Sequence, residues 1–131
     1  NIKIIDESYN SNPLSLEFAV NKFDKIEIHK KRKYILLGDM LELGRFSKKL
    51  HIQIAKFINK SNANKIYVYG NHVKHTFDKI KTQKKGKIFK DKNEIINFIR
   101  NDLSNKDYLM IKGSNATGLN KVVSKFTEGA I

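Results

Sequence analysis

The sequence predicts an α/β domain of three layers, a Rossmann-like fold in which helices cover both faces of a mostly parallel sheet of five or six strands. Short β-branched or aromatic runs alternate five times with longer segments of helical periodicity. This alternation is typical of right-handed strand–helix–strand units. The length of 131 residues suits a single domain, and we expect residues 1–131 to form one.

Five segments are expected to form strands because each is too short for a helix and is bounded by residues that favour turns. They are Lys3–Ile5, Tyr34–Leu37, Lys65–Tyr69, Lys87–Phe89 and Tyr108–Ile111.

A helix is expected after each strand, because apolar residues there recur with the spacing of one helical face. Pro13 suits the first turn of the first helix, Ser47 can cap the second and Asp91 or Asn93 the fourth. The apolar faces are expected at Leu14, Phe18, Val20 and Phe23, at Leu50, Ile54, Phe57 and Ile58, at Val73, Phe77 and Ile80, at Ile95, Ile96 and Ile99, and at Leu119, Val122, Val123 and Phe126.

Composition excludes several classes of protein. The chain has no cysteine, which rules out disulfide scaffolds and sites in which cysteine holds zinc or an iron–sulfur cluster. No apolar run approaches the length of a membrane span, and residues 1–10 lack the apolar core of a signal peptide. We therefore expect a cytoplasmic domain and, since the chain does not begin with Met, a fragment of a longer protein.

The net charge of +13 is carried mostly by lysine, with 23 Lys against 3 Arg. Arginine is the residue that reads guanine in a bidentate fork, so its scarcity argues against sequence-specific DNA binding. The basic runs Lys30–Lys33 and Lys84–Lys87 precede strands, and we expect them to form a solvated surface at the amino edge of the sheet. A basic module that binds nucleic acid through its phosphates is the alternative.

Three polar segments follow strands and are expected to meet at the carboxyl edge of the sheet, where open α/β sheets bind their ligands. These segments are Asp6–Pro13, Gly38–Gly44 and Lys112–Gly118. Their clustering is the strongest physical indication of a functional site.

Each segment has a structural and a functional interpretation. Residues 113–118 have the spacing of a phosphate loop but lack its Lys-Ser/Thr ending, so they form either a plain strand-to-helix turn or a contact to an anion held elsewhere. Residues 6–12 either cap the first helix or bind a ribose. Asp39 and Glu42 supply too few oxygens for a metal site, and His51 is either a packing residue or a ligand.

Taken in order, the segments resemble the motifs of a known family. Asp6–Pro13 resembles D-[DE]-S-Y-N-A-N-P, Leu37–Gly44 followed by His51 resembles L-G-D-M-L-E-L-G…H, and Ile111–Ser114 resembles V-K-G-S. These motifs are similar to those of the C-terminal domain of MurF-type enzymes in the Mur ligase family. The resemblance extends from Lys3 to about Phe126.

The resemblance implies an ATP-dependent ligase that adds D-Ala-D-Ala to UDP-MurNAc-tripeptide through an acyl phosphate in peptidoglycan synthesis. It implies ATP and Mg²⁺ as cofactors, with the metal held mainly by a central domain and the UDP group by an N-terminal domain. The C-terminal domain would close over ATP and help to receive the dipeptide. Its partners would be these substrates and its own other domains, not a membrane or a specific nucleic acid, and alone it would be inactive.

The resemblance also assigns site residues by position, without a catalytic residue or metal ligand. The expected nucleotide contacts are Asp6, Glu7, Asn10 and Asn12. The expected substrate contacts are Asp39, Glu42, His51, Lys112, Ser114 and Asn115.

Three positions depart from the family pattern: Ser11 replaces Ala, Glu7 stands where Asp is common, and Asn115 stands where Arg often follows. The last change removes a positive charge and puts the phosphate role of its loop in doubt. The equivalent domain of a sister ligase, another Mur enzyme or folylpolyglutamate synthase, is the remaining alternative.

Overall fold

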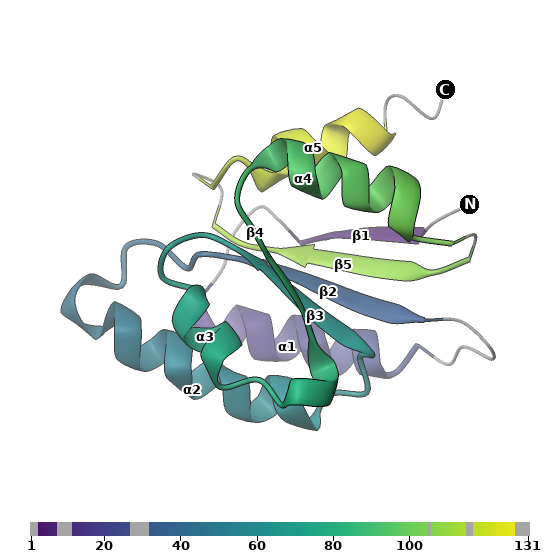
Figure 1. The fold of residues 1–131 in the computed structure, drawn as a ribbon. Coiled ribbons are helices and arrows are strands. Elements are labelled where there is room, and N and C mark those ends of the chain that lie inside the picture. Colours follow the sequence, from purple (N-terminus) through teal and green to yellow (C-terminus); the bar gives the residue numbers. More distant parts are fainter. Residues whose placement is uncertain (1–2, 8–11, 27–31, 105, 115–116, 128–131) are drawn as a thin grey trace.

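In the computed structural model, five parallel strands form one sheet that has helices on both faces (Figure 1). The structure describes residues 3–7, 12–26, 32–104, 106–114 and 117–127. The strand order is β1-β5-β2-β3-β4. The strands are β1 (Lys3–Glu7), β2 (Lys33–Gly38), β3 (Lys65–Tyr69), β4 (Lys85–Phe89) and β5 (Tyr108–Lys112). The predicted α/β fold with a parallel sheet is confirmed.

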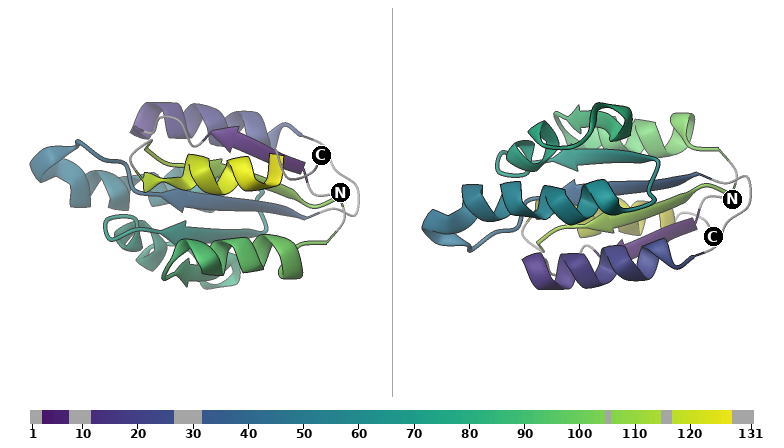
Figure 2. Two further views of the ribbon diagram at one scale, coloured as in Figure 1. Left: turned by 90° about the horizontal axis from the view of Figure 1, so that it is seen from above. Right: turned by 90° about the horizontal axis from the view of Figure 1, so that it is seen from below.

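The helices divide into two layers, which Figures 1 and 2 show on opposite faces of the sheet. One layer holds α1 (Pro13–Asp24), α2 (Ser47–Lys60) and α3 (Lys74–Asp78). The other holds α4 (Lys92–Asn97), the π-helical turn η3 (Phe98–Asp102) that continues it, and α5 (Leu119–Thr127). Two short 3₁₀ turns, η1 (Gly44–Phe46) and η2 (Thr82–Lys84), precede α2 and β4. No helix among the described residues is long and apolar enough to cross a membrane.

The central strand β2 contributes to both halves of the core. Ile35 and Leu37 pack in the cluster on the α1–α2–α3 side, and Tyr34 and Leu36 pack in the cluster on the α4–α5 side. Every residue of β2 is buried, as expected for a parallel strand that is covered on both faces.

The path of the chain places β5 between β1 and β2. The connections that leave β1 and β2 run through α1 and α2 on one face, whereas β5 continues into α5 on the opposite face (Figure 1). Neighbouring strands whose connections diverge in this way open a crevice at their carboxyl ends, where ligands bind in folds of this class.

The apolar face of α1 differs from the prediction. Leu14 and Phe18 are 77% and 71% exposed, so the expectation that they face the core is wrong. The helix buries the stripe that contains Leu16, Ala19, Val20 and Phe23 instead. This stripe follows the i, i+3, i+4, i+7 spacing. Leu14 and Phe18 form a second apolar stripe beside it, and periodicity alone does not tell which of the two stripes is buried.

The helix caps are as predicted at one of two positions. Asp91 caps α4 by accepting a hydrogen bond from the Glu94 amide at 2.9 Å. Ser47 does not cap α2, because the turn η1 leads directly into that helix and its N-cap residue is Phe46.

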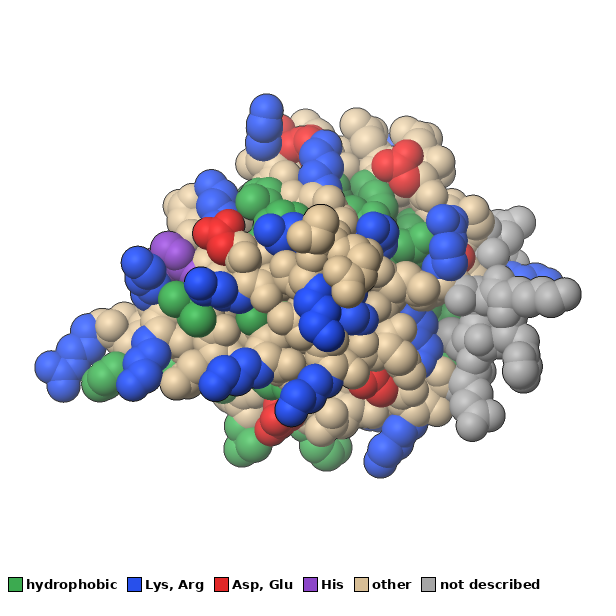
Figure 3. Space-filling view, turned by 60° about the horizontal axis from the view of Figure 1, so that its bottom comes forward, with side chains coloured by type: hydrophobic (Ala, Val, Ile, Leu, Met, Phe, Trp, Pro, Cys, Tyr) green, Lys and Arg blue, Asp and Glu red, His purple; other side chains and the backbone are tan. Residues whose placement is uncertain are grey.

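On the face of the molecule in Figure 3, positive charge is dispersed instead of being gathered in one stripe. On this face, lysine and arginine side chains stand apart, separated by polar and apolar groups. A dispersed charge of this kind gives weak, salt-dependent attraction to polyanions and no defined binding track.

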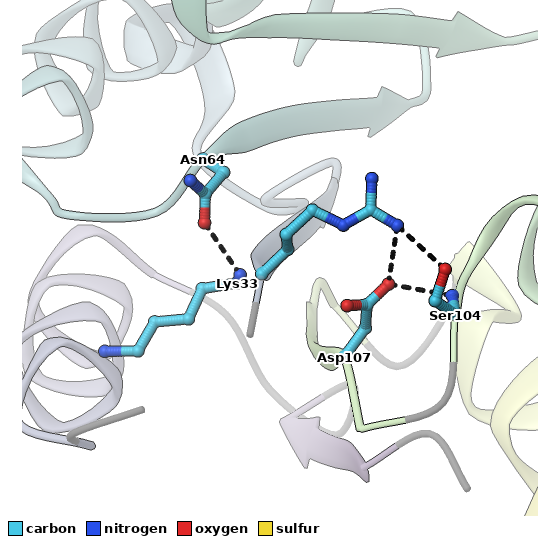
Figure 4. A network of polar contacts seen from close by, with 5 residues as sticks. Lys33, Asn64, Ser104 and Asp107 are labelled. Atoms are coloured by element: carbon cyan, nitrogen blue, oxygen red, sulfur yellow. Dashed lines mark hydrogen bonds and ion pairs between the residues drawn. The ribbon is translucent and has the colours of Figure 1, made fainter. Parts of the chain in front are cut away.

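The expectation that the whole basic edge is solvated is wrong for Lys33, because this residue is only 6% exposed. The Lys33 ammonium donates to the carbonyls of Phe23 and Asp24 at 3.0 and 3.2 Å, and to Asn62 Oδ1 at 3.2 Å. Figure 4 shows Asn64, whose side chain accepts from the Lys33 backbone amide at 2.9 Å. Lys33 therefore ties the end of α1 and the start of β3 to β2.

We expect Lys33→Ala to destabilise the chain, because the end of α1 loses the donor that satisfies its carbonyl groups. The free energy of unfolding should fall by about 1–3 kcal/mol, measured by urea denaturation. The control is Lys25→Ala, an exposed position at the end of the same helix, which should change stability by less than about 0.5 kcal/mol. Equal effects of the two substitutions would contradict the structural role of Lys33.

Candidate functional site at the carboxyl edge of the sheet

The ends of β1, β5 and β2 lie side by side. Glu7 pairs with Lys112 across β1 and β5, and Lys112 pairs with Leu37 across β5 and β2. Since all three strands are parallel, the polar segments that follow them start from the same edge. The predicted convergence of these segments is therefore confirmed for the residues that the structure describes.

Two of the three segments are joined directly. The Ser114 amide donates to the Asp39 carbonyl at 3.0 Å, and the Leu41 amide donates to Ser114 Oγ at 2.8 Å. Glycines permit this approach, since a Cβ placed on Gly113 would lie 3.1 Å from the Gly38 Cα. Ser114 thus holds the loop after β2 as well as its own loop.

Asp39 connects the loop after β2 to the loop after β3. Its Oδ1 accepts hydrogen bonds from the amides of His72 and Val73 at 3.0 and 2.8 Å, and the residue is buried. Gly70 makes room for the carboxylate, because a Cβ at that position would lie 2.3 Å from Asp39 Oδ1. Asp39 therefore holds the backbone at the carboxyl edge of the sheet, and its Oδ1 already accepts two hydrogen bonds.

His51 lies beneath this edge and is 0% exposed. Its Nε2 accepts a hydrogen bond from the Met40 amide at 3.1 Å, and its Nδ1 lies 2.7 Å from the Ser47 carbonyl. This pairing requires the neutral tautomer with the proton on Nδ1. Burial lowers the pKa of His51, and the hydrogen bond to Ser47 opposes that shift. With both ring nitrogens engaged, the packing interpretation of His51 is the one that the geometry supports.

Asn12 acts as the cap of α1. Its Oδ1 accepts from the Ser15 amide at 2.8 Å, and Ser15 Oγ accepts from the Asn12 amide at 3.1 Å. This reciprocal pair is a capping box. The structure therefore supports the interpretation of Asn12 as a helix cap. A nucleotide would compete with the Ser15 amide for Asn12 Oδ1.

The remaining predicted residues differ in how they lie at the edge. Asp6 and Glu42 are exposed, and Glu42 has a left-handed backbone with φ of 66°. Lys112 is buried at the end of β5. Asn10 and Asn115 lie outside the described residues, and for Glu7 only the strand position is described.

A cavity of about 550 Å³ opens at the same edge, beside the ends of β2, β3 and β4. Asn71, Lys74 and Lys90 line it together with Asp39 and Thr117. The two lysines give the cavity positive charge, which suits an anionic group of a ligand. The sequence places Asn71 and Lys90 in segments that follow β3 and β4, where a site is expected, but it did not single them out as ligand contacts. Lys74 lies at the start of α3 and was not predicted.

Metal ligands are not gathered here. Within the described part of the chain, no group of three or more histidine or acidic residues is arranged to hold a metal ion. Asp39, the buried carboxylate of this edge, is already bonded to backbone amides. The residues described on this chain therefore do not fit a Mg²⁺ site.

Comparison with known proteins places this arrangement in a family. The family defined as the Mur ligase glutamate ligase domain matches residues 1–115. The chain belongs to the Mur ligase family. Its match to this domain includes β1, the loop after β2 and the Lys112–Ser114 segment.

Two curated relatives of this Mur ligase domain are named UDP-N-acetylmuramoyl-tripeptide–D-alanyl-D-alanine ligase. The protein from Rickettsia prowazekii is 29% identical over 96% of this chain and 28% of its own length. The protein from Buchnera aphidicola (subsp. Acyrthosiphon pisum) is 31% identical over 92% of this chain and 26% of its own length. The chain thus spans little more than a quarter of the relatives that it matches.

Solved structures agree on the fold of the Mur ligase domain. The MurF ligase from Thermotoga maritima, determined in complex with ADP, has a TM-score of 0.77 at 22% identity and covers 97% of this chain and 28% of its own. A MurF structure from Acinetobacter baumannii has the same TM-score at 21% identity, over 95% of this chain and 28% of its own.

The lowered pKa of His51 predicts an acid-dependent loss of stability. The folded state binds the proton less readily than the unfolded chain, so the contribution of neutral His51 is complete above about pH 6.5 and is lost as the pH falls through the folded-state pKa. His51→Gln should lower the free energy of unfolding by about 1–3 kcal/mol at pH 7. It should also flatten the decrease in stability between about pH 7 and pH 5.

Urea denaturation at a series of pH values measures both effects. His75→Gln, a half-buried position on α3, is the control and should leave most of the slope in place. An unchanged slope in His51→Gln would mean that protonation of His51 is not linked to unfolding.

Proposed function

We propose that this chain is the C-terminal domain of a ligase that joins D-Ala-D-Ala to UDP-MurNAc-tripeptide in peptidoglycan synthesis. The observation that carries the proposal is the convergence of the three family segments at one edge of the sheet. The curated relatives named above support the specific reaction, since they align over nearly all of this chain.

The chemistry of this reaction is divided, in this proposal, between this chain and a central domain. A carboxylate does not react with an amine unaided, so ATP first transfers its γ-phosphoryl group to the terminal carboxylate of the tripeptide. The amine of the dipeptide then attacks the acyl phosphate, the amide bond forms, and inorganic phosphate leaves. Mg²⁺ and a phosphate loop belong, in this proposal, to a central domain outside this chain.

This chain's part is to close over the nucleotide and position the second substrate. Asp6, Glu7 and Asn10 are proposed to face the ribose and phosphates, with Asn12 holding the start of α1 behind them. Lys112 and Ser114 are proposed to face the reaction centre. Exclusion of water by such closure protects the acyl phosphate from hydrolysis.

The loop after β2 and the cavity beside it are proposed to receive the dipeptide. Glu42 and Asn115 remain candidate contacts, whereas Asp39 and His51 are proposed to hold the loop's backbone in place. The positive charge of Lys74 and Lys90 suits the carboxylate of D-Ala-D-Ala. We expect the whole enzyme to work in the cytoplasm, where ATP is supplied.

In the longer enzyme, Lys112→Ala should lower kcat/KM by about 10- to 100-fold, because it removes a cation from the reaction centre. A coupled assay of phosphate release with both substrates measures this. The matched control is Lys25→Ala, which removes the same charge from the exposed end of α1 at the opposite edge of the sheet. Equal losses of activity would contradict the proposed place of Lys112.

The 131-residue chain alone should neither hydrolyse ATP nor form the amide, because in this proposal the phosphate loop and the Mg²⁺ site lie in other domains. The assay is phosphate release from ATP with both substrates present. Turnover above that of buffer would show that this domain carries catalytic groups of its own, and would overturn the division of roles described above.

A further inference from the structure

A second cavity, of about 670 Å³, lies on the α4 side of the sheet near the starting ends of β3 and β4. The helical layer on this side of the sheet consists of α4, η3 and α5 (Figure 1). Tyr67 of β3 and Gly86 of β4 line the floor, and Asn97 and Asn101 line the wall. We call this cavity the β4 groove.

Aromatic rings form the floor of the β4 groove. The Tyr67 ring lies 4.3 Å from that of Phe98 and 5.5 Å from that of Phe89, measured between centroids. Phe89 and Phe98 are buried, whereas Tyr67 is half-buried and lines the groove while packing against both rings. Gly86 keeps this ring in place, since a Cβ at that position would lie 2.6 Å from the Tyr67 ring.

Two tyrosine side chains, Tyr34 and Tyr67, line the β4 groove. Among the described residues, neither Tyr34 nor Tyr67 donates or accepts a side-chain hydrogen bond, and no fully buried side-chain oxygen lacks a partner. Tyr34 is buried and Tyr67 is half-buried, so Tyr67 is the more accessible of the two. Burial raises the pKa of Tyr67 to about 12, so its hydroxyl is a protonated donor at neutral pH.

Cations surround the opening. Arg32, Lys65, Lys85 and Lys87 line the cavity together with the acidic residues Glu94 and Asp102. Lys87 is paired with Glu94 at 2.6 Å, Lys65 Nζ donates to the Gln83 carbonyl at 3.1 Å, and the Lys85 ammonium lies over the Phe77 ring. Arg32 uses only Nη2 for its bonds to Ser104 and Asp107, both at 3.1 Å. The side chain of Arg32 is half-exposed, which leaves its other nitrogens able to bind an anion.

We propose that the β4 groove binds a nucleoside phosphate. Its base would lie against Tyr67 with its polar edge toward the amides of Asn97 and Asn101, and its phosphate would meet Arg32 and Lys65. The volume is within the range of about 300–1,000 Å³ that is typical of small-ligand sites. Aromatic rings beside a cationic groove are the elements that hold stacked bases and their phosphates. This site is separate from the proposed function at the carboxyl edge and does not depend on it.

The test is a titration of the ¹⁵N-labelled 131-residue chain, followed by NMR, with adenosine monophosphate, adenosine and inorganic phosphate. We expect saturable shifts of the Tyr67, Lys87, Asn97 and Asn101 amides with the monophosphate. Adenosine and phosphate should each bind at least about fivefold more weakly, because each lacks one half of the recognised ligand.

Matched variants test the location. Lys65→Glu should weaken binding of the monophosphate by at least about fivefold, since it replaces a phosphate contact with a repelling charge. Tyr67→Phe should weaken it less while keeping the ring. Lys48→Glu makes the same charge change at an exposed position on α2 and should have little effect.

Four results would overturn the proposal. The first three are no saturable shift, equal weakening by Lys65→Glu and Lys48→Glu, and shifts confined to the carboxyl edge of the sheet. Binding of phosphate alone as tightly as the monophosphate would also reject it, because the aromatic floor would then contribute nothing. None of these results would affect the ligase proposal, which the assay of amide formation tests separately.

Discussion

The close approach of β2 and β5 is the constraint on which the carboxyl edge depends. Gly38 and Gly113 permit it, since a side chain on either would meet the opposite backbone or Leu119. The contact inserts the last strand between the first two, so segments more than seventy residues apart in sequence meet at one edge. Without that insertion, the loops after β1 and β2 would be neighbours, and the Lys112–Gly118 segment would lie elsewhere.

Several polar residues at this edge stabilise the loops and α1. Asp39, His51 and Asn12 use their polar atoms to satisfy backbone groups of the loops and of α1. These atoms are engaged in holding the backbone of the loops. A sequence motif of this kind therefore includes residues that fix the loops of a candidate site in place.

The sequence predicts some of these features better than others. The strand and helix alternation, the cap at Asp91 and the meeting of the polar loops follow from local patterns, and the structure agrees with them. The strand order does not follow, because it depends on which crossover returns to the middle of the sheet. Lys33 and the buried stripe of α1 were predicted wrongly, because charge and periodicity do not reveal which neighbour will cover a residue.

The features of the candidate site also differ in how well the sequence predicts them. Its location could be predicted from the rule for parallel sheets, whereas the engaged nitrogens of His51 depend on atoms that are distant in sequence. The aromatic rings of the β4 groove come from β2, β3, β4 and η3 and have no common sequence motif. Only the folded sheet brings them together.

The hydrogen bonds between Asp39 and the loop after β3, and between Ser114 and the loop after β2, join the loops after β2, β3 and β5 into one unit. A surface fixed in this way loses little conformational entropy when it binds a ligand. Any large movement of this edge toward a ligand is then a movement of the domain as a whole and not a rearrangement of its separate loops.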